Sequence, residues 1–163
     1  MKRNAELFTR WMEMDAFSIL MRSHESIRPW ANAQFDAPKV VPHTVRLTRV
    51  HSALKPYLKH LEEEAKRGIP VMRPDFFEEG RFDAGNDPYS YFLGDDLYVC
   101  PVIEYRAKKR EVSLPKGEWI GFWDGNAYDG GTSFTMAAPL GQIPVFYRKE
   151  SRFAELFRAA AQE

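Results

Sequence analysis

The chain has 163 residues, with 23 basic and 23 acidic side chains and a formal net charge of zero. A zero net charge argues against broad binding to nucleic acid or to anionic membranes, since both depend on a basic surplus. No run of about 18 apolar residues is present, so the sequence predicts no transmembrane helix. Apolar residues make up 44% of the chain and charged residues 28%, values typical of a globular protein. The length suits one domain, or one and a half.

The single cysteine, Cys100, excludes an internal disulfide and a cluster of thiolate metal ligands. The first residues, 1–6, lack the apolar core of a signal peptide, and together these features favour a reducing, cytoplasmic location. We expect no cofactor and no metal site. His51 and His60 in particular do not have the i, i+4 spacing of two ligands on one helix, and His51 is interpreted as a surface or half-buried residue.

The first part of the chain has a helical pattern. Residues 5–21 carry apolar side chains at spacings of three and four, which predicts an amphipathic helix, and 18–21 either extend it or form a short buried strand. Residues 22–42 contain three prolines and are expected to form a long loop. The clearest predicted helix spans 44–67, with Thr44 as its N-cap, Gly68 after its end, and a kink at Pro56.

After Gly68 the pattern changes to short β runs separated by turns. Residues 69–77 are expected to form a strand or an extended arm, and later runs recur at roughly ten-residue spacing, as in a β-sandwich or barrel. Residues 151–161 are expected to form a short helix. The later β runs are 98–103, 110–114, 118–123, 133–136 and 145–148.

Three groups of residues are candidates for ligand binding or catalysis. Arg22, Ser23, His24 and Glu25 follow an apolar run, and a guanidinium with an imidazole and a carboxylate can position a polyhydroxylated ligand. From spacing alone we favour the alternative, the start of a solvated loop. Asp95 and Asp96 are adjacent, so in a strand they would point to opposite faces, and we interpret them as part of a turn or strand start.

The third of these groups consists of aromatic residues, in a chain that is 14% aromatic. Trp119, Phe122 and Trp123 could form a carbohydrate-binding platform. We favour the alternative, in which they fill a sandwich core and place one ring at an interface between domains. Cys100 is interpreted as a small core residue.

Several blocks, in this order, resemble the C-terminal part of glycoside hydrolase family 31, a family of retaining α-glycosidases. One long loop is similar to the sulfoquinovosidase branch, through His24-Glu25, Arg28-Pro29 and the run Asn32 to Phe35. Asp75 and Asp15 depart from the pattern of the family. The blocks are ELFTRWMEMDAF at 6–17 leading to MRSH at 21–24, Pro56-Tyr57, GIPVMRP at 68–74, YFLGDDLYVCPV at 91–102, LPKGEW at 114–119 and the stretch 138–146.

The resemblance implies the last elements of a (β/α)8 barrel followed by a small antiparallel β-sandwich. The barrel part would be 1–68, the sandwich 69–150, and a C-terminal helix 151–163. Active sites of such barrels lie at the C-terminal ends of the strands. The resemblance assigns His24 to the sugar hydroxyls of the cleavage subsite, with Arg22 as a supporting group, so the expected substrate is an α-glycoside.

Retaining glycosidases need two carboxyl groups about 5 Å apart. No residue here matches either carboxylate motif of the family, so no catalytic residue is assigned. The chain is expected to be the end of a longer enzyme and to be inactive alone. Alternatives are an α-glucosidase or α-xylosidase of the same family, a non-catalytic carbohydrate-binding module, and a subunit that self-associates or docks to a separate barrel half through exposed apolar edges.

Overall fold

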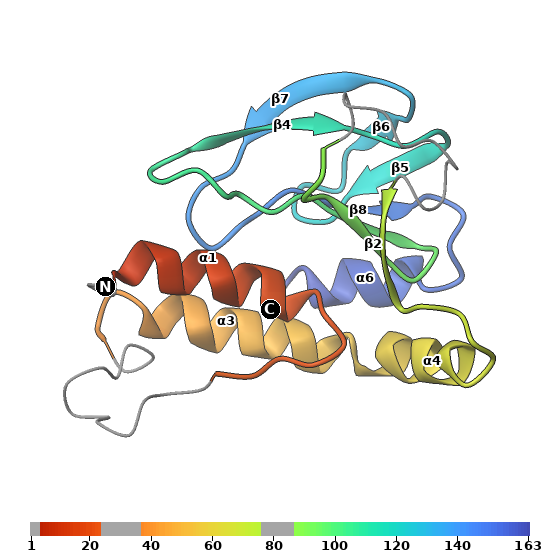
Figure 1. The fold of residues 1–163 in the computed structure, drawn as a ribbon, viewed down its shortest axis with the longest axis horizontal. Coiled ribbons are helices and arrows are strands. Elements are labelled where there is room, and N and C mark those ends of the chain that lie inside the picture. Colours follow the sequence, from red (N-terminus) through yellow and green to blue (C-terminus); the bar gives the residue numbers. More distant parts are fainter. Residues whose placement is uncertain (1–3, 24–36, 76–86) are drawn as a thin grey trace.

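The computed structural model describes residues 4–23, 37–75 and 87–163, which form three layers (Figure 1). A two-stranded sheet, β4-β7, lies over one face of a six-stranded antiparallel sheet with the order β1-β2-β3-β8-β5-β6, and the helices lie against the other face. The strands are β1 Met72–Pro74, β2 Tyr91–Leu93, β3 Leu97–Val99, β4 Lys109–Ser113, β5 Glu118–Gly121, β6 Ala127–Asp129, β7 Ser133–Ala137 and β8 Val145–Arg148. The helices are α1 Ala5–Ala16, α3 Val41–Ala53, α4 Lys55–Ala65 and α6 Ala154–Ala160.

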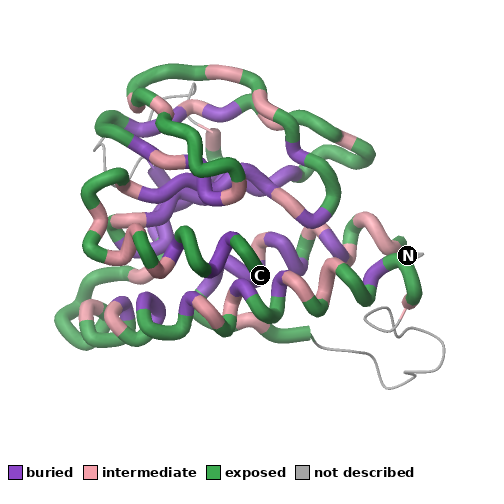
Figure 2. Tube along the Cα trace, turned by 180° about the vertical axis from the view of Figure 1, so that it is seen from behind, coloured by how far each residue is buried: buried purple, intermediate pink, exposed green. Residues whose placement is uncertain are grey.

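The central strands are buried on both faces, which explains their almost continuous apolar sequences (Figure 2). In β3, Leu97 and Val99 belong to the core shared with the helices, whereas Tyr98 belongs to the core under β4 and β7. Strands β2 and β8 alternate in the same way, as the period of two in a strand requires. One six-stranded sheet therefore supplies both cores.

The predicted antiparallel sandwich is present, and the later β runs of the sequence correspond to strands β3, β4, β5, β7 and β8. Strand β6 was not predicted, because its three residues lie between two turns rich in glycine and aspartate. Strand β2, also three residues long, was not distinguished from the turns beside it. Neither strand is long enough to show an alternation of its own.

The predicted helix over 44–67 is divided in two at Leu54, which ends α3 and precedes α4. Pro56 lies in the first turn of α4, where its missing N–H is tolerated, whereas a continuous helix would need that group and would bring the ring against the preceding turn. The prediction of Thr44 as N-cap is wrong. The helix starts at Val41, and the Thr44 N–H already donates to the Val40 carbonyl at 3.0 Å.

Helix α1 ends at Ala16, earlier than predicted. Its N-cap is Asn4, whose side-chain oxygen accepts from the Leu7 N–H at 2.6 Å. The prediction that 18–21 extend the helix or form a buried strand is wrong. Ile19 and Leu20 are 44% and 67% exposed, and no described strand pairs with them. Most of the expected loop, residues 24–36, lies outside the described residues.

Within the described ranges, none of the helices combines the length and the apolar character that crossing a bilayer would require.

Candidate functional site

Of the two residues predicted to contact the sugar or support that contact, the structure describes Arg22. Arg22 is described and exposed, six residues after the end of α1. His24 lies outside the described residues, so its role stays a prediction. The geometry that can be argued is therefore that of the segment 17–23, which leads from α1 to His24.

The chain is anchored where it leaves α1. Phe17 is fully buried, and its ring packs edge-on against Phe122 at 5.1 Å and Trp123 at 5.9 Å between ring centres. The Tyr91 hydroxyl donates to the Phe17 carbonyl at 3.0 Å. Ser18 turns the chain, since its hydroxyl contacts the carbonyl of Asp15 at 2.8 Å and that of Leu20 at 3.0 Å. The start of the segment is thus fixed to the central sheet.

His51 adds a second anchor from α3. It is half-buried, as the sequence indicated, and its Nδ1 lies 3.1 Å from the Ala16 carbonyl oxygen. A carbonyl can only accept, so this contact requires the proton on Nδ1. The neighbouring carboxyl of Asp15 is buried, and desolvation raises its pKa, while the Trp11 indole N–H and His51 oppose the rise. The buried carboxyl of Asp15 is accommodated by these polar neighbours.

No group of three metal-ligating side chains converges anywhere in the described part of the chain. His60 contacts Glu64 and Arg152.

A buried ion pair joins α1 to the β-layers. Arg10 contacts Glu13 at 3.0 Å and also donates to the carbonyls of Ala107 at 2.9 Å and Ala138 at 2.8 Å. Glu13 accepts from the Gly141 N–H. Burial raises the pKa of Glu13, and the Arg10 guanidinium counters part of this rise. The pair fixes the orientation of α1, the helix after which the chain continues to Arg22.

The other candidate groups of the sequence are structural. Asp95 and Asp96 lie in the β2–β3 turn, as interpreted, where Asp95 pairs with Arg73 and burial raises the pKa of Asp96. Cys100 is fully buried, and desolvation raises the pKa of its thiol to about 12, so it is a poor nucleophile at neutral pH. Asp75 is buried and accepts from the Tyr98 hydroxyl at 3.4 Å.

The preferred interpretation of the aromatic group is confirmed. Trp119 is fully buried in the core between the sheets, and its indole N–H donates to the Pro115 carbonyl at 2.8 Å. Phe122 is buried in the core shared with the helices. Trp123 is partly buried against Phe17, with the Arg46 guanidinium 4.5 Å from its ring centre. Burial of Trp119 and Phe122 excludes the alternative of a carbohydrate platform on these rings.

Sequence reasoning missed Tyr91 and His51 as partners of α1. Their hydrogen bonds to Phe17 and Ala16 join residues 74 and 35 positions apart, and no local pattern reports such a pairing. Arg10 was noted only within the block 6–17, and nothing in that block indicates its bonds to the β-layers.

Comparison with known proteins gives consistent matches. The sequence model of the "Glycosyl hydrolase family 31 C-terminal domain" matches residues 68–151. The sulfoquinovosidase of Escherichia coli (strain K12) is 43% identical over 160 residues, which are 96% of this chain and 24% of the relative. Alpha-glucosidase 2 of Bacillus thermoamyloliquefaciens is 32% identical over 158 residues, 93% of this chain and 20% of that protein.

A solved structure agrees with these matches. A family 31 sulfoquinovosidase from E. rectale, in complex with the aza-sugar inhibitor IFGSQ, superposes with a TM-score of 0.89 at 41% identity. The match covers 99% of this chain and 24% of that one. The chain thus spans about a quarter of the length of the sulfoquinovosidases it matches. The family-model match over more than half of its length shows that the chain belongs to glycoside hydrolase family 31.

Proposed function

We propose that this chain is the C-terminal part of a sulfoquinovosidase-like retaining α-glycosidase. The observation that carries the proposal is 43% identity over almost the whole chain to a sulfoquinovosidase, against 32% to an α-glucosidase of the same family. In this proposal residues 1–68 complete a (β/α)8 barrel, 69–150 form the C-terminal β-sandwich, and 151–163 form a C-terminal helix. The remaining strands of the barrel belong to a longer protein.

The reaction requires groups that this chain does not supply. A retaining glycosidase uses one carboxylate as nucleophile and a second carboxyl as acid and base. The buried carboxyls in the described ranges accept hydrogen bonds within the fold: Glu13 from Arg10, Asp15 from the Trp11 indole, and Asp75 from Tyr98. We therefore assign both catalytic carboxyls to the rest of the longer protein. In the proposal, His24 binds sugar hydroxyls in the cleavage subsite and Arg22 supports it.

A chimaera tests this function. The matching quarter of the E. coli sulfoquinovosidase is replaced by residues 4–163, and turnover of an aryl α-sulfoquinovoside is measured beside the isolated chain. We expect turnover by the chimaera and none by the isolated chain, because positioning without a nucleophile offers no covalent path. His24→Ala in the chimaera should lower kcat/KM by about 10- to 100-fold, the loss of one strong hydrogen bond to substrate.

The matched control is Ser23→Ala in the same chimaera, which changes the neighbouring side chain and should leave kcat/KM within a few-fold. A His24→Ala chimaera as active as its parent, in a protein that turns over substrate, would remove the assignment of His24. Turnover by the isolated chain would contradict the assignment of the catalytic carboxyls to the longer protein.

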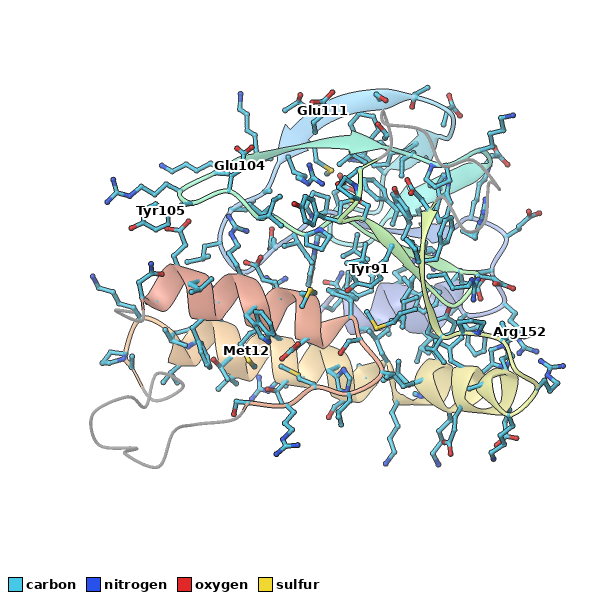
Figure 3. All side chains as sticks on the ribbon, viewed as in Figure 1. Met12, Tyr91, Glu104, Tyr105, Glu111 and Arg152 are labelled. Carbon is cyan, nitrogen blue, oxygen red and sulfur yellow. The ribbon has the colours of Figure 1, made fainter. Side chains whose placement is uncertain are left out.

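The exposed apolar side chains of α1 and its surroundings support a second proposal, that the isolated chain self-associates. Trp11 is 59% exposed, Leu20 67% and Tyr105 64%. Trp11 and Tyr105 line one groove of about 410 Å³ between α1 and the β3–β4 connection, where Figure 3 places Tyr105 and Glu104 above the start of α1. In the longer protein the same surface would be covered by the rest of the barrel.

Light scattering checks this prediction. We expect dimers or larger species at micromolar concentration, and a shift toward monomer in Tyr105→Glu, because a charge opposes burial of the groove that Tyr105 lines. Leu140→Glu, at an exposed apolar residue outside the groove, is the control and should leave the size distribution unchanged. A wild-type chain that stays monomeric up to high concentration would contradict self-association.

A further inference from the structure

The C-terminal end of α1 is held by side chains from a strand of the central sheet and from a neighbouring helix. The last carbonyls of a helix have no partner within it and commonly bind water or a local cap. Here the Tyr91 hydroxyl, from β2, lies 3.3 Å from the Met14 carbonyl oxygen and 3.0 Å from that of Phe17. The Nδ1 atom of His51, from α3, lies 3.1 Å from the Ala16 carbonyl oxygen.

These contacts connect a rigid support to the predicted site. Tyr91 is buried and lies in β2, which is paired on both sides, with β1 and with β3. Figure 3 labels Tyr91 between the sheet and the helices. Beyond the helix end, the Ser18 hydroxyl also lies 3.0 Å from the Leu20 carbonyl oxygen, a local contact two residues before Arg22. The bonds to the sheet and to α3 end at Phe17 and Ala16, so they fix the point from which the segment leading to Arg22 starts.

We infer that Tyr91 and His51 are positioning residues for the segment 17–23, which leads to the predicted site, and that they act through the carbonyls at the end of α1. The inference rests on the proposed function, since it deepens the account of the same site. A hydrogen bond from a strand and one from a helix restrain the exit of the chain in two directions. Reaction rates depend steeply on such placement, because a displacement of about 1 Å can lower activity by about 100-fold.

Amide hydrogen exchange on the 163-residue chain tests the structural half of the inference. Tyr91→Phe keeps the ring and removes only the hydroxyl, so we expect faster exchange at residues 15–23 and unchanged exchange in β8. Tyr57→Phe is the matched control, because the buried Tyr57 hydroxyl also donates to a backbone carbonyl, that of Leu93 at 2.7 Å, at the β2–β3 turn. The inference is overturned if exchange at 15–23 is the same in Tyr91→Phe and Tyr57→Phe.

Steady-state kinetics of the chimaera test the functional half. Tyr91→Phe should lower kcat/KM by about tenfold, mainly through kcat, as expected when a contacting group is displaced and substrate is still bound. His51→Leu should act in the same direction. His51→Asn, which returns an N–H donor near the place of Nδ1, should recover part of the loss, whereas a residue needed only for packing would gain nothing from Asn.

The outcomes separate the two proposals. If His24→Ala lowers activity while Tyr91→Phe and His51→Leu match their parent, the positioning role is overturned and the proposed function stands. If His24→Ala is without effect, the proposed function fails at this site, and the exchange result alone then reports on the anchoring of α1. A fall in kcat for both positioning variants, with partial recovery in His51→Asn, supports the inference.

Discussion

Replacing Arg10 by methionine should lower the free energy of unfolding by about 3–5 kcal/mol, because it leaves a buried carboxylate without its counter-ion. Methionine fills a similar length, so the change removes charge and donors more than volume. Glu13 is fully buried, and the carbonyls of Ala107 and Ala138 would lose their donor at the same time. Urea denaturation followed by tryptophan fluorescence measures the effect.

The pH dependence gives this prediction a second readout. Burial raises the pKa of Glu13, so the folded chain holds this proton more tightly than the unfolded chain does. Stability from this group is therefore greatest at low pH and falls as the pH rises from its ordinary pKa through the folded-state pKa. Since Arg10 opposes the rise, Arg10→Met should raise the pKa of Glu13 further and steepen that loss.

The control is the double variant Arg10→Met with Glu13→Gln. Glutamine can still accept from the Gly141 N–H and carries no charge, so the double variant should be more stable than Arg10→Met alone at neutral pH. Its stability should also lack the steep pH dependence of the single variant. Equal stability of the two at neutral pH would show that the lost carbonyl contacts of Arg10, and not the lone carboxylate, account for the destabilisation.

The sequence predicted those helices and strands that depend on the spacing of nearby residues or on a single turn residue. The spacing of apolar residues located α1, and glycine turns separated most of the strands, because a glycine with positive φ, such as Gly117 or Gly131, ends a run at a definite place. Pro56 correctly indicated an interruption of the long helix. The errors concern elements with little local sequence pattern. These are the three-residue strands, and the helix start at Val41, where no side chain caps the helix.

The contacts that orient the candidate site are of another kind. Arg10 reaches Ala107 and Ala138, 97 and 128 positions away, and Tyr91 reaches Phe17 across 74 positions. Such pairings are consequences of how layers pack and leave no periodic trace in the sequence. The prediction for Arg22 and His24 depends on the resemblance to a family, since the residues alone favour a solvated loop.

The segment 18–21 illustrates the same limit. Its apolar sequence predicted burial, yet Ile19 and Leu20 are exposed, because an extended segment is buried only when neighbours pair with it and cover it. Among the described residues no strand does so.

Replacing Trp119 by alanine should lower the free energy of unfolding by about 3–5 kcal/mol, the usual effect of removing a large buried ring. Trp119 fills the core between the two sheets, within 6.1 Å of Phe92 and 6.0 Å of Tyr98 between ring centres. The Arg148 guanidinium lies 4.1 Å from its ring centre and would lose that support. Urea denaturation of the chain, followed by circular dichroism because a tryptophan is lost, measures the change.

Trp119→Phe and Tyr105→Ala are the matched variants for this prediction. Phenylalanine keeps most of the ring but not the N–H to Pro115, so its loss should be smaller than that of alanine. Tyr105 is 64% exposed, and Tyr105→Ala should change stability by no more than about 0.5 kcal/mol. A binding platform at Trp119 would give the opposite pattern: unchanged stability in Trp119→Ala, together with weaker binding of sulfoquinovosides in a fluorescence titration. That result would contradict the assignment of this ring to the core.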